Sequence, residues 1–136
     1  MPRQAVLLAV RAVIKRRNGR ILLIQRALKT QRNPGHWELP GGMIQSSEPI
    51  RAALKREVKE ETGLIVFPGS SEPLTFISPM TKEERYVELV FHCKRVRGEK
   101  VRLSAEHQNS RWATVESALD LKLTPTAREL MEFLLD

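Results

Sequence analysis

The sequence predicts an α+β protein in which a mixed β-sheet lies between helices, as in an α/β/α sandwich. Two observations support this fold class. Apolar stretches with a strand-like bias occur early and late in the chain, at residues 4–15, 21–26 and 86–96. Residues 49–62 and 124–135 instead carry apolar side chains at helical spacing. Strands that alternate with helices favour a sheet covered by helices.

The length and the cysteine content fit a small intracellular protein. A chain of 136 residues fits one domain, residues 1–136, with a single core. The single cysteine, Cys93, excludes an internal disulfide, and its apolar neighbours predict a core thiol. The apolar run near the start is interrupted by Arg11 and is too short to span a bilayer. We therefore expect a cytoplasmic protein without membrane contact.

The charge balance is strongly basic. The net charge of +7 and the pI near 10.1 fit polyanionic substrates, and composition alone would also fit nucleic-acid binding. The basic residues are scattered along the chain, and no aromatic-rich RNA-binding signature accompanies them. RNA therefore stays open as a partner but is not favoured.

Two strands are predicted first. Residues 4–15 are typical of a long, mostly buried strand, and the Asn-Gly pair at 18–19 predicts a hairpin with residues 21–26 as antiparallel partner. Arg11 lies within the first strand and Arg26 ends the second. Each either points to solvent, the direction favoured for Arg11, or faces the phosphates of a substrate, since planar guanidinium groups suit phosphate oxygens. The sequence leaves both alternatives open.

The central helix has recognisable ends. Ser-Ser-Glu-Pro at 46–49 offers hydroxyls that can cap free N–H groups and then a proline, and Gly63 can take the left-handed conformation after the last turn. We expect a helix over residues 49–62. Its predicted buried stripe consists of Ile50, Ala53, Leu54 and Val58.

Three carboxylates share one face of this helix. Glu57, Glu60 and Glu61 stand at i, i+3 and i+4, so like charges repel near a helix C-terminus that disfavours anions. A fold that keeps this arrangement has a cation to place there, and hard oxygen ligands favour Mg²⁺, Mn²⁺ or Ca²⁺. The alternative is a solvated face neutralised by neighbouring basic residues.

The complete pattern favours the metal site. Residues 42–64 match G-x5-E-x7-R-E-U-x-E-E-x-G-U, with U aliphatic, at every specified position, and residues 37–42 read Trp-Glu-Leu-Pro-Gly-Gly. This stretch resembles the Nudix box and its usual lead-in. The resemblance implies the Nudix fold and a Mg²⁺- or Mn²⁺-dependent hydrolase of nucleoside diphosphates linked to another moiety.

The resemblance also assigns roles within the box. Glu57, Glu60 and Glu61 would be metal ligands and part of the catalytic site. Glu48 would be an auxiliary ligand, direct or through water, and Arg56 would orient the glutamates by ion pairing.

Further candidates lie outside the helix. Glu38, Gly41 and Gly42 in the lead-in are candidate substrate-binding residues, together with the two strand arginines described above; Trp37 is a packing anchor. Glu106, shortly before a tryptophan, is a candidate metal ligand or general base. An equal alternative is that Glu106 is an ordinary loop residue without a catalytic role. His107 beside it is interpreted as a bystander.

The remaining elements follow the helix. Residues 65–67 and 74–78 are candidate strands, and residues 115–119 form a short helical turn. Residues 86–96 form a strand with Val87, Leu89, Phe91 and Cys93 on one face, and the last helix, residues 124–135, is expected to cover the other face of the sheet through Ala127, Leu130, Met131, Leu134 and Leu135.

The predicted reaction is attack of water on a pyrophosphate bridge, with a carboxylate accepting the proton. The compact layout resembles MutT-like nucleoside triphosphate pyrophosphohydrolases. Pro79, 15 residues beyond Leu64, keeps ADP-ribose or nucleotide-sugar pyrophosphatases as the alternative. A third class is RNA 5′-end processing or a non-catalytic nucleotide-binding module, but the retention of all box glutamates favours an enzyme. The protein could be a monomer or a homodimer.

Overall fold

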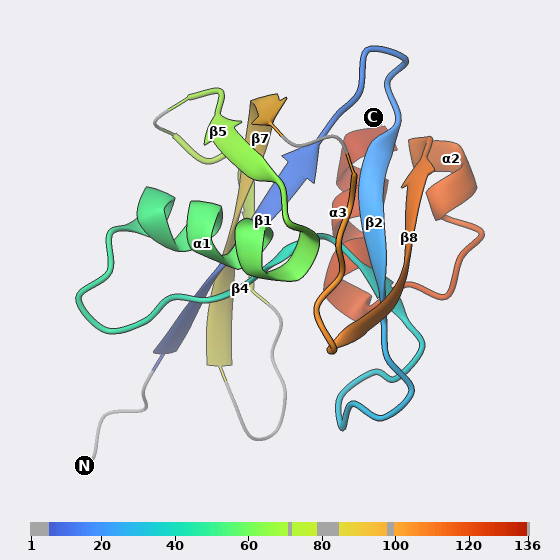
Figure 1. Ribbon diagram of the computed structural model, residues 1–136, viewed down its shortest axis with the longest axis horizontal. Helices are drawn as coiled ribbons and strands as arrows, with labels where there is room; N and C mark the ends of the chain where they lie inside the picture. Colours follow the sequence, from blue (N-terminus) through green and yellow to red (C-terminus); the bar gives the residue numbers. More distant parts are fainter. Residues whose placement is uncertain (1–5, 71, 79–84, 98–99, 136) are drawn as a thin grey trace.

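The computed structural model describes residues 6–70, 72–78, 85–97 and 100–135 (Figure 1). The elements of these residues are β1 (Val6–Ile14), β2 (Ile21–Arg26), β3 (Trp37–Glu38), β4 (Gly41–Met43), α1 (Ile50–Thr62), β5 (Ile65–Pro68), β6 (Thr75–Ile77), β7 (Arg85–Arg97), β8 (His107–Ala113), α2 (Val115–Ala118) and α3 (Pro125–Leu135). None of these helices has the length and apolar character that crossing a bilayer requires.

The strands divide between two sheets. The large sheet has five strands in the order β4-β1-β7-β5, and β6 also pairs with β7. The small sheet has the order β3-β2-β8. In the large sheet β1 runs parallel to β7 and antiparallel to β4, so the sheet is mixed. Mixed sheets combined with helices confirm the predicted α+β class.

The hairpin prediction was wrong beyond its turn. The turn forms, with the Gly19 N–H donating to the Arg16 carbonyl at 2.9 Å, and a single bridge joins Lys15 to Ile21. From there β2 leaves β1 and pairs with β3 and β8 instead. Both long edges of β1 are already taken by β4 and β7, so no free edge remains for β2. The divergence places the two strands in different sheets.

Two apolar clusters cover the two faces of the large sheet. One lies under α1 and includes Leu54, Val58 and Phe91; the other lies around α3 and includes Trp37, which confirms its predicted packing role, and Leu130. In Figure 1, α1 and α3 lie on different sides of β1. The α3 residues Ala127, Leu130 and Met131 are buried as predicted, whereas Leu135 is exposed. Burial on both faces explains the near-continuous apolar sequence of β1.

Helix α1 ends as predicted but begins differently. Gly63 is left-handed, with φ 75°, and its N–H donates to the Lys59 carbonyl at 2.9 Å. At the other end Pro49 is the cap residue and no side chain caps the helix, so the expected serine hydroxyl cap does not form. The fixed φ of proline suits this position without such a bond. Ile50 is 38% exposed and does not belong to the buried stripe.

Strand β7 is buried on both sides where it crosses the centre of the large sheet. Phe91 and Cys93 lie in the cluster under α1, with Leu89 packed against it, as the sequence predicted. Glu88 and Val90 face the other way and are also buried. Burial raises the pKa of the Cys93 thiol to about 12, which fits a core residue. A carboxylate at Glu88, in the middle of this strand, requires a partner.

Candidate active site

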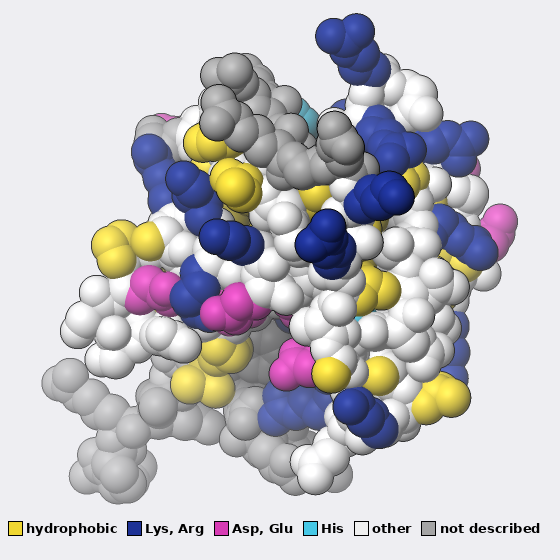
Figure 2. All heavy atoms as spheres, in the orientation of Figure 1, with side chains coloured by type: hydrophobic (Ala, Val, Ile, Leu, Met, Phe, Trp, Pro, Cys, Tyr) yellow, Lys and Arg dark blue, Asp and Glu magenta, His cyan; other side chains and the backbone are white. Residues whose placement is uncertain are grey.

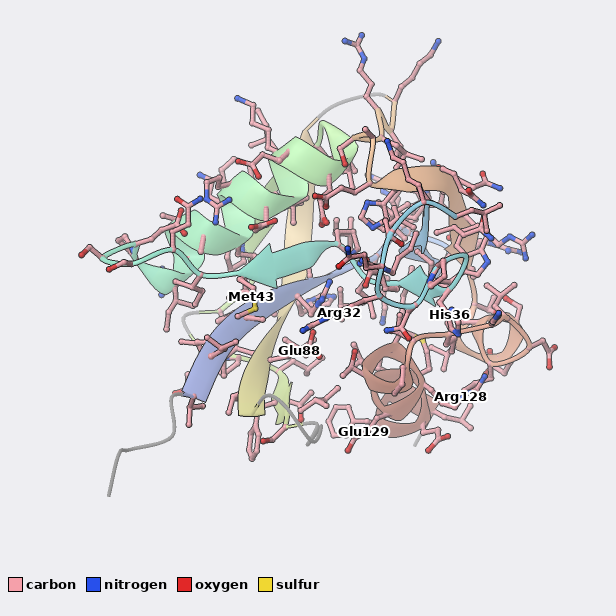
Figure 3. All side chains as sticks on the ribbon, turned by 90° about the horizontal axis from the view of Figure 1, so that it is seen from below. Arg32, His36, Met43, Glu88, Arg128 and Glu129 are labelled. Carbon is pink, nitrogen blue, oxygen red and sulfur yellow. The ribbon has the colours of Figure 1, made fainter. Side chains whose placement is uncertain are left out.

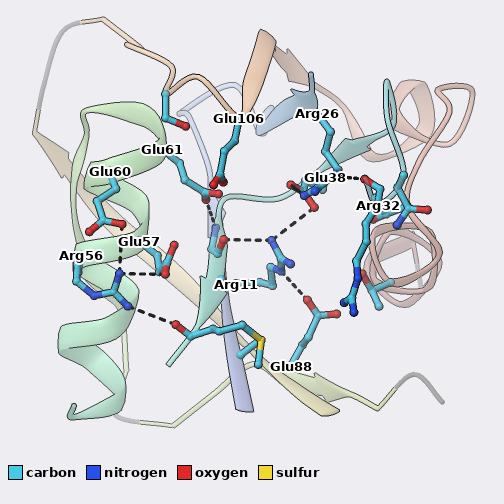
Figure 4. Close-up of a pocket in the computed structure, with 18 of the residues that line it drawn as sticks. Arg11, Arg26, Arg32, Glu38, Arg56, Glu57, Glu60, Glu61, Glu88 and Glu106 are labelled. Carbon is cyan, nitrogen blue, oxygen red and sulfur yellow. Dashed lines mark hydrogen bonds and ion pairs between the residues drawn. The ribbon is translucent and has the colours of Figure 1, made fainter. Parts of the chain in front are cut away.

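One open cavity of about 1020 Å³ lies beside α1 and β4 (Figure 4). Further walls come from β1, the segment before β8 and the start of α3. Six carboxylates and four arginines of the described residues line it: Glu38, Glu57, Glu60, Glu61, Glu88 and Glu106, with Arg11, Arg26, Arg32 and Arg56. Figure 2 shows acidic side chains gathered beside a hollow, while Lys and Arg side chains spread over the rest of this face. The lining therefore carries an excess of negative charge.

Arg56 organises the helix side of the cavity. Its Nε donates to Glu48 Oε2 at 2.6 Å, and its Nη1 donates to Glu57 Oε1 at 3.0 Å and to Glu60 Oε2 at 3.2 Å. Its Nη2 also reaches the Met43 carbonyl at 3.3 Å. The bond from Arg56 lowers the pKa of Glu48. We name Arg56 and these three glutamates, together with Glu61, the helix-side group. Arg56 forms ion pairs with the box glutamates, which is the contact that its predicted orienting role requires.

Two glycines let β4 approach the helix-side group. The Gly41 N–H donates to Glu61 Oε1 at 2.7 Å. A Cβ at Gly41, where φ is 148°, would lie 2.0 Å from the Val10 carbonyl oxygen, so only glycine fits. A Cβ at Gly42 would lie 2.6 Å from Glu57 Oε2. The lead-in glycines thus hold Glu61 directly and leave room for Glu57.

Arg11 belongs to the cavity wall and not to the solvent-facing surface, which corrects the direction favoured from sequence. Its Nε donates to Glu88 Oε1 at 2.5 Å, and its Nη1 donates to the Leu39 and Gly41 carbonyls at 3.0 and 3.3 Å. The same Nη1 lies 3.7 Å from Glu38 Oε1. The parallel pairing of β1 with β7 sets Glu88 opposite Ala9, which is two residues from Arg11 and on the same face of the sheet. Figure 3 shows Glu88 between the large sheet and α3.

Glu38 and His107 complete a second group of charges. Glu38 Oε2 accepts from Arg26 Nη1 at 3.0 Å and lies 2.8 Å from His107 Nε2. Both residues are buried. Burial opposes the ionisation of Glu38, but Arg11 and the bond from His107 outweigh it and hold its pKa below the ordinary value. We name Arg11, Arg26, Glu38, Glu88 and His107 the sheet-side group.

The helix-side carboxylates nearest to β4 lack sufficient positive charge. Burial raises the pKa of Glu61 to about 8, despite the opposing effect of Arg11, and burial also raises the pKa of Glu57. Partly desolvated carboxylates offer only oxygen atoms as ligands, and such a ligand set suits a hard divalent cation. The residues present therefore fit a cation at Glu57 and Glu61. A second set of ligand atoms, which shares Glu61 with the first, comes from Glu38, Glu61 and His107, and these atoms lie within 4.8 Å of one another.

The structure brings together the candidates from the box, the lead-in and both strand arginines, and it adds two residues. Glu106 lines the cavity and is exposed. Glu88 and His107 were missed. A carboxylate amid the apolar residues of 86–96 was a signal for Glu88, but alternation alone would have placed it in solvent. His107 offered no signal beyond its place next to Glu106.

This fold and this site define a class of protein. The family model described as NUDIX domain matches residues 6–134. The chain therefore belongs to the NUDIX domain family, as the box predicted, and it is a pyrophosphohydrolase enzyme.

Individual relatives agree with this assignment. The chain is 34% identical over 126 residues to a MutT-like protein of Streptomyces ambofaciens, covering 93% of this chain and 75% of that protein. It is 32% identical over 107 residues to the nucleoside triphosphatase NudI of Escherichia coli O139:H28, covering 72% and 75%. Its fold matches the crystal structure of the MutT protein from Methanosarcina mazei Go1 with a TM-score of 0.84 and 29% identity, over 98% of this chain and 95% of that one.

Proposed function

We propose that this enzyme is a MutT-like nucleoside triphosphate pyrophosphohydrolase that uses Mg²⁺ or Mn²⁺. The observation that carries the proposal is the excess of carboxylates in the cavity, with Glu57 and Glu61 desolvated beside Gly41 and Gly42. The likeness to a nucleoside triphosphatase at 32% identity supports the substrate class. A triphosphate also matches the net charge of +7.

The helix-side group would hold the cation. Glu57, Glu60 and Glu61 supply oxygen ligands, and Glu48 is an auxiliary carboxylate that Arg56 keeps in place. When bound, a divalent cation neutralises phosphate charge and lowers the pKa of a coordinated water. Arg56 acts as a positioning residue, because its Nε and both its Nη atoms are engaged with carboxylates or a carbonyl.

Proton transfer and substrate contacts fall to other lining residues. We assign to Glu106 the role of general base, because it is an exposed carboxylate on the cavity wall, free to accept a proton from the attacking water. Arg11 and Arg26 place positive charge beside the phosphates, and Glu38 keeps both guanidinium groups in position. Gly41 and Gly42 bring β4 against Glu61 and Glu57, and this close approach would leave room there for a bound cation and the phosphates.

The first experiment is a hydrolysis screen with Mg²⁺ and then Mn²⁺, in which the products are separated by chromatography, over canonical and oxidised nucleoside triphosphates, ADP-ribose, dinucleoside polyphosphates and triphosphorylated RNA. We expect pyrophosphate release from a nucleoside triphosphate. Preferential cleavage of ADP-ribose would replace the proposed substrate by the alternative, for which the sequence signal, Pro79, lies outside the described residues. Activity on RNA that falls steeply with salt would favour 5′-end processing.

The variant that tests the metal assignment is Glu60→Gln. Its side chain is 57% exposed, so we expect native folding, while turnover falls about 1000-fold because one oxygen ligand loses its charge. Glu132→Gln, on the exposed face of α3, is the matched control and should keep full turnover. Steady-state rates measure the turnover of both variants, and circular dichroism shows whether they are folded. A folded Glu60→Gln enzyme with normal turnover would refute the assignment of Glu60 as a ligand.

A further inference from the structure

One histidine ring nitrogen in the site has no hydrogen-bond partner within the described part of the chain. The side chain of His107 is fully buried, and its Nδ1 has no hydrogen-bond partner among the described residues. This atom faces Glu61 Oε2 at 3.9 Å, too far for a hydrogen bond. The other ring nitrogen, Nε2, lies 2.8 Å from Glu38 Oε2. A buried polar atom that is left without a partner is costly and requires an explanation.

The surroundings of Glu38 determine which ring nitrogen carries the proton. Arg26 and Arg11 both lie against the Glu38 carboxylate, so it is ionised and can only accept hydrogen bonds. Nε2 of His107 therefore donates to Glu38. The other ring nitrogen, Nδ1, faces a carboxyl oxygen of Glu61 at a distance too long for the two atoms to share a proton. A cation between this buried nitrogen and this oxygen would give both atoms a partner.

The arrangement matches the usual surroundings of a metal-bound histidine. Such a histidine donates its second ring N–H to a carboxylate, which fixes the tautomer and orients the ring, and Glu38 does this here. Two ligand atoms with bonds of about 2.0–2.2 Å to one divalent cation, at angles of about 90–110°, lie roughly 3.0–3.6 Å apart. The 3.9 Å between His107 Nδ1 and Glu61 Oε2 is slightly longer, so the two side chains would move slightly closer together on binding.

We propose that His107 Nδ1 and Glu61 Oε2 together bind a divalent cation, with Glu38 as the residue that orients the imidazole. The site shares Glu61 with the site of the proposed function and rests on it in that respect. A nitrogen ligand shifts preference from Mg²⁺ toward Mn²⁺, Co²⁺ or Zn²⁺. The proposal thus gives the active site a nitrogen ligand that the glutamate pattern of residues 42–64 does not contain.

The test uses the full chain with Mn²⁺ alone and no substrate. Pulsed electron paramagnetic resonance detects a ¹⁴N nucleus that is directly bound to Mn²⁺. We expect this coupling in the native protein and in the control His36→Asn, and we expect its loss in His107→Asn, with Mn²⁺ affinity reduced about 10- to 100-fold. In Glu38→Gln the coupling should persist while the affinity falls, because Glu38 orients the ligand without binding the ion.

The native protein can overturn the proposal even if His107→Asn does not fold. In protein labelled with ¹⁵N-histidine the ¹⁴N coupling should be replaced by a ¹⁵N coupling. Bound Mn²⁺ without any histidine nitrogen coupling would overturn the proposal, and metal-dependent hydrolysis in the same sample would leave the proposed function intact. Histidine coupling in a protein that cleaves no nucleotide would support the metal site and contradict the proposed function instead.

Discussion

The helix-side group and the sheet-side group border the same cavity but are built in opposite ways. The helix-side residues come from α1 and the loop before it, and Glu60 among them is exposed. The sheet-side residues come from β1, β2, β3, β7 and β8, and Arg11 and Glu88 are 77 positions apart in the chain. The helix-side carboxylates remain short of positive charge, whereas most sheet-side charges are paired. We infer that the helix-side group binds the cation, while the paired charges of the sheet-side group mainly fix the shape of the cavity and the position of His107.

The largest expected effect concerns the pair of Arg11, which is partly buried, and Glu88, which is buried. Glu88→Leu removes the nearest charged partner of a guanidinium in the cavity wall and leaves it only the more distant Glu38. Because a poorly compensated charge is unfavourable there, we expect the free energy of unfolding to fall by about 3–4 kcal/mol. Urea denaturation measures it, with Glu129→Leu on α3 as the control for adding an apolar side chain.

A double variant separates charge from packing at this pair. Arg11→Met combined with Glu88→Leu removes both charges, so it should recover most of the stability that Glu88→Leu loses. If Glu88→Leu alone is as stable as the native protein, the sheet-side group does not fix the shape of the cavity and the contrast between the two groups fails.

Two neighbouring glycines sharpen the comparison, because a Cβ at Gly41 would meet the backbone of β1 and a Cβ at Gly42 would meet only the helix-side group. In Gly41→Ala the Cβ meets the β1 backbone, which cannot move, and we expect about 3 kcal/mol of destabilisation. In Gly42→Ala the Cβ meets only the end of the Glu57 side chain, which can turn aside. We expect nearly native stability there, with turnover reduced about 100-fold because the proposed metal ligand Glu57 is displaced.

Thermal unfolding and steady-state kinetics measure the stability and the turnover of Gly41→Ala and Gly42→Ala, and each variant is the control for the other. Equal losses of stability in both would show that the backbone around residues 41–42 is constrained as a unit and that the two groups are not separable at this point.

The smallest effect is expected at Arg56→Lys. Lysine keeps the charge but cannot bond Glu48, Glu57 and Glu60 together, because it lacks the planar fork of arginine. We expect turnover to fall about tenfold and stability to change by less than about 1 kcal/mol, since the pairs are partly exposed. A variant with native turnover would show that Arg56 does not position the carboxylates.

The same contrast explains what sequence reasoning could find. The box residues lie within 23 consecutive positions, so helix periodicity alone brings Glu57, Glu60 and Glu61 together. Glu88 and His107 reach the cavity only because their strands pair with distant parts of the chain and are buried. No local sequence pattern predicts this pairing. The separation of β1 from β2 was missed for a similar reason, because the turn is local whereas the choice of sheet depends on which edges are occupied. The one-domain organisation stays a prediction.

Because Cys93 is buried, its rate of chemical labelling can report on the unfolding of the protein. The sequence has no other thiol, and a pKa of about 12 leaves little thiolate at neutral pH, so a sulfhydryl reagent can modify Cys93 only when β7 is exposed. The labelling rate therefore reports the free energy of local or global unfolding at the centre of the large sheet. The same inert background lets a cysteine engineered into the exposed turn at Asn18 carry a single fluorophore.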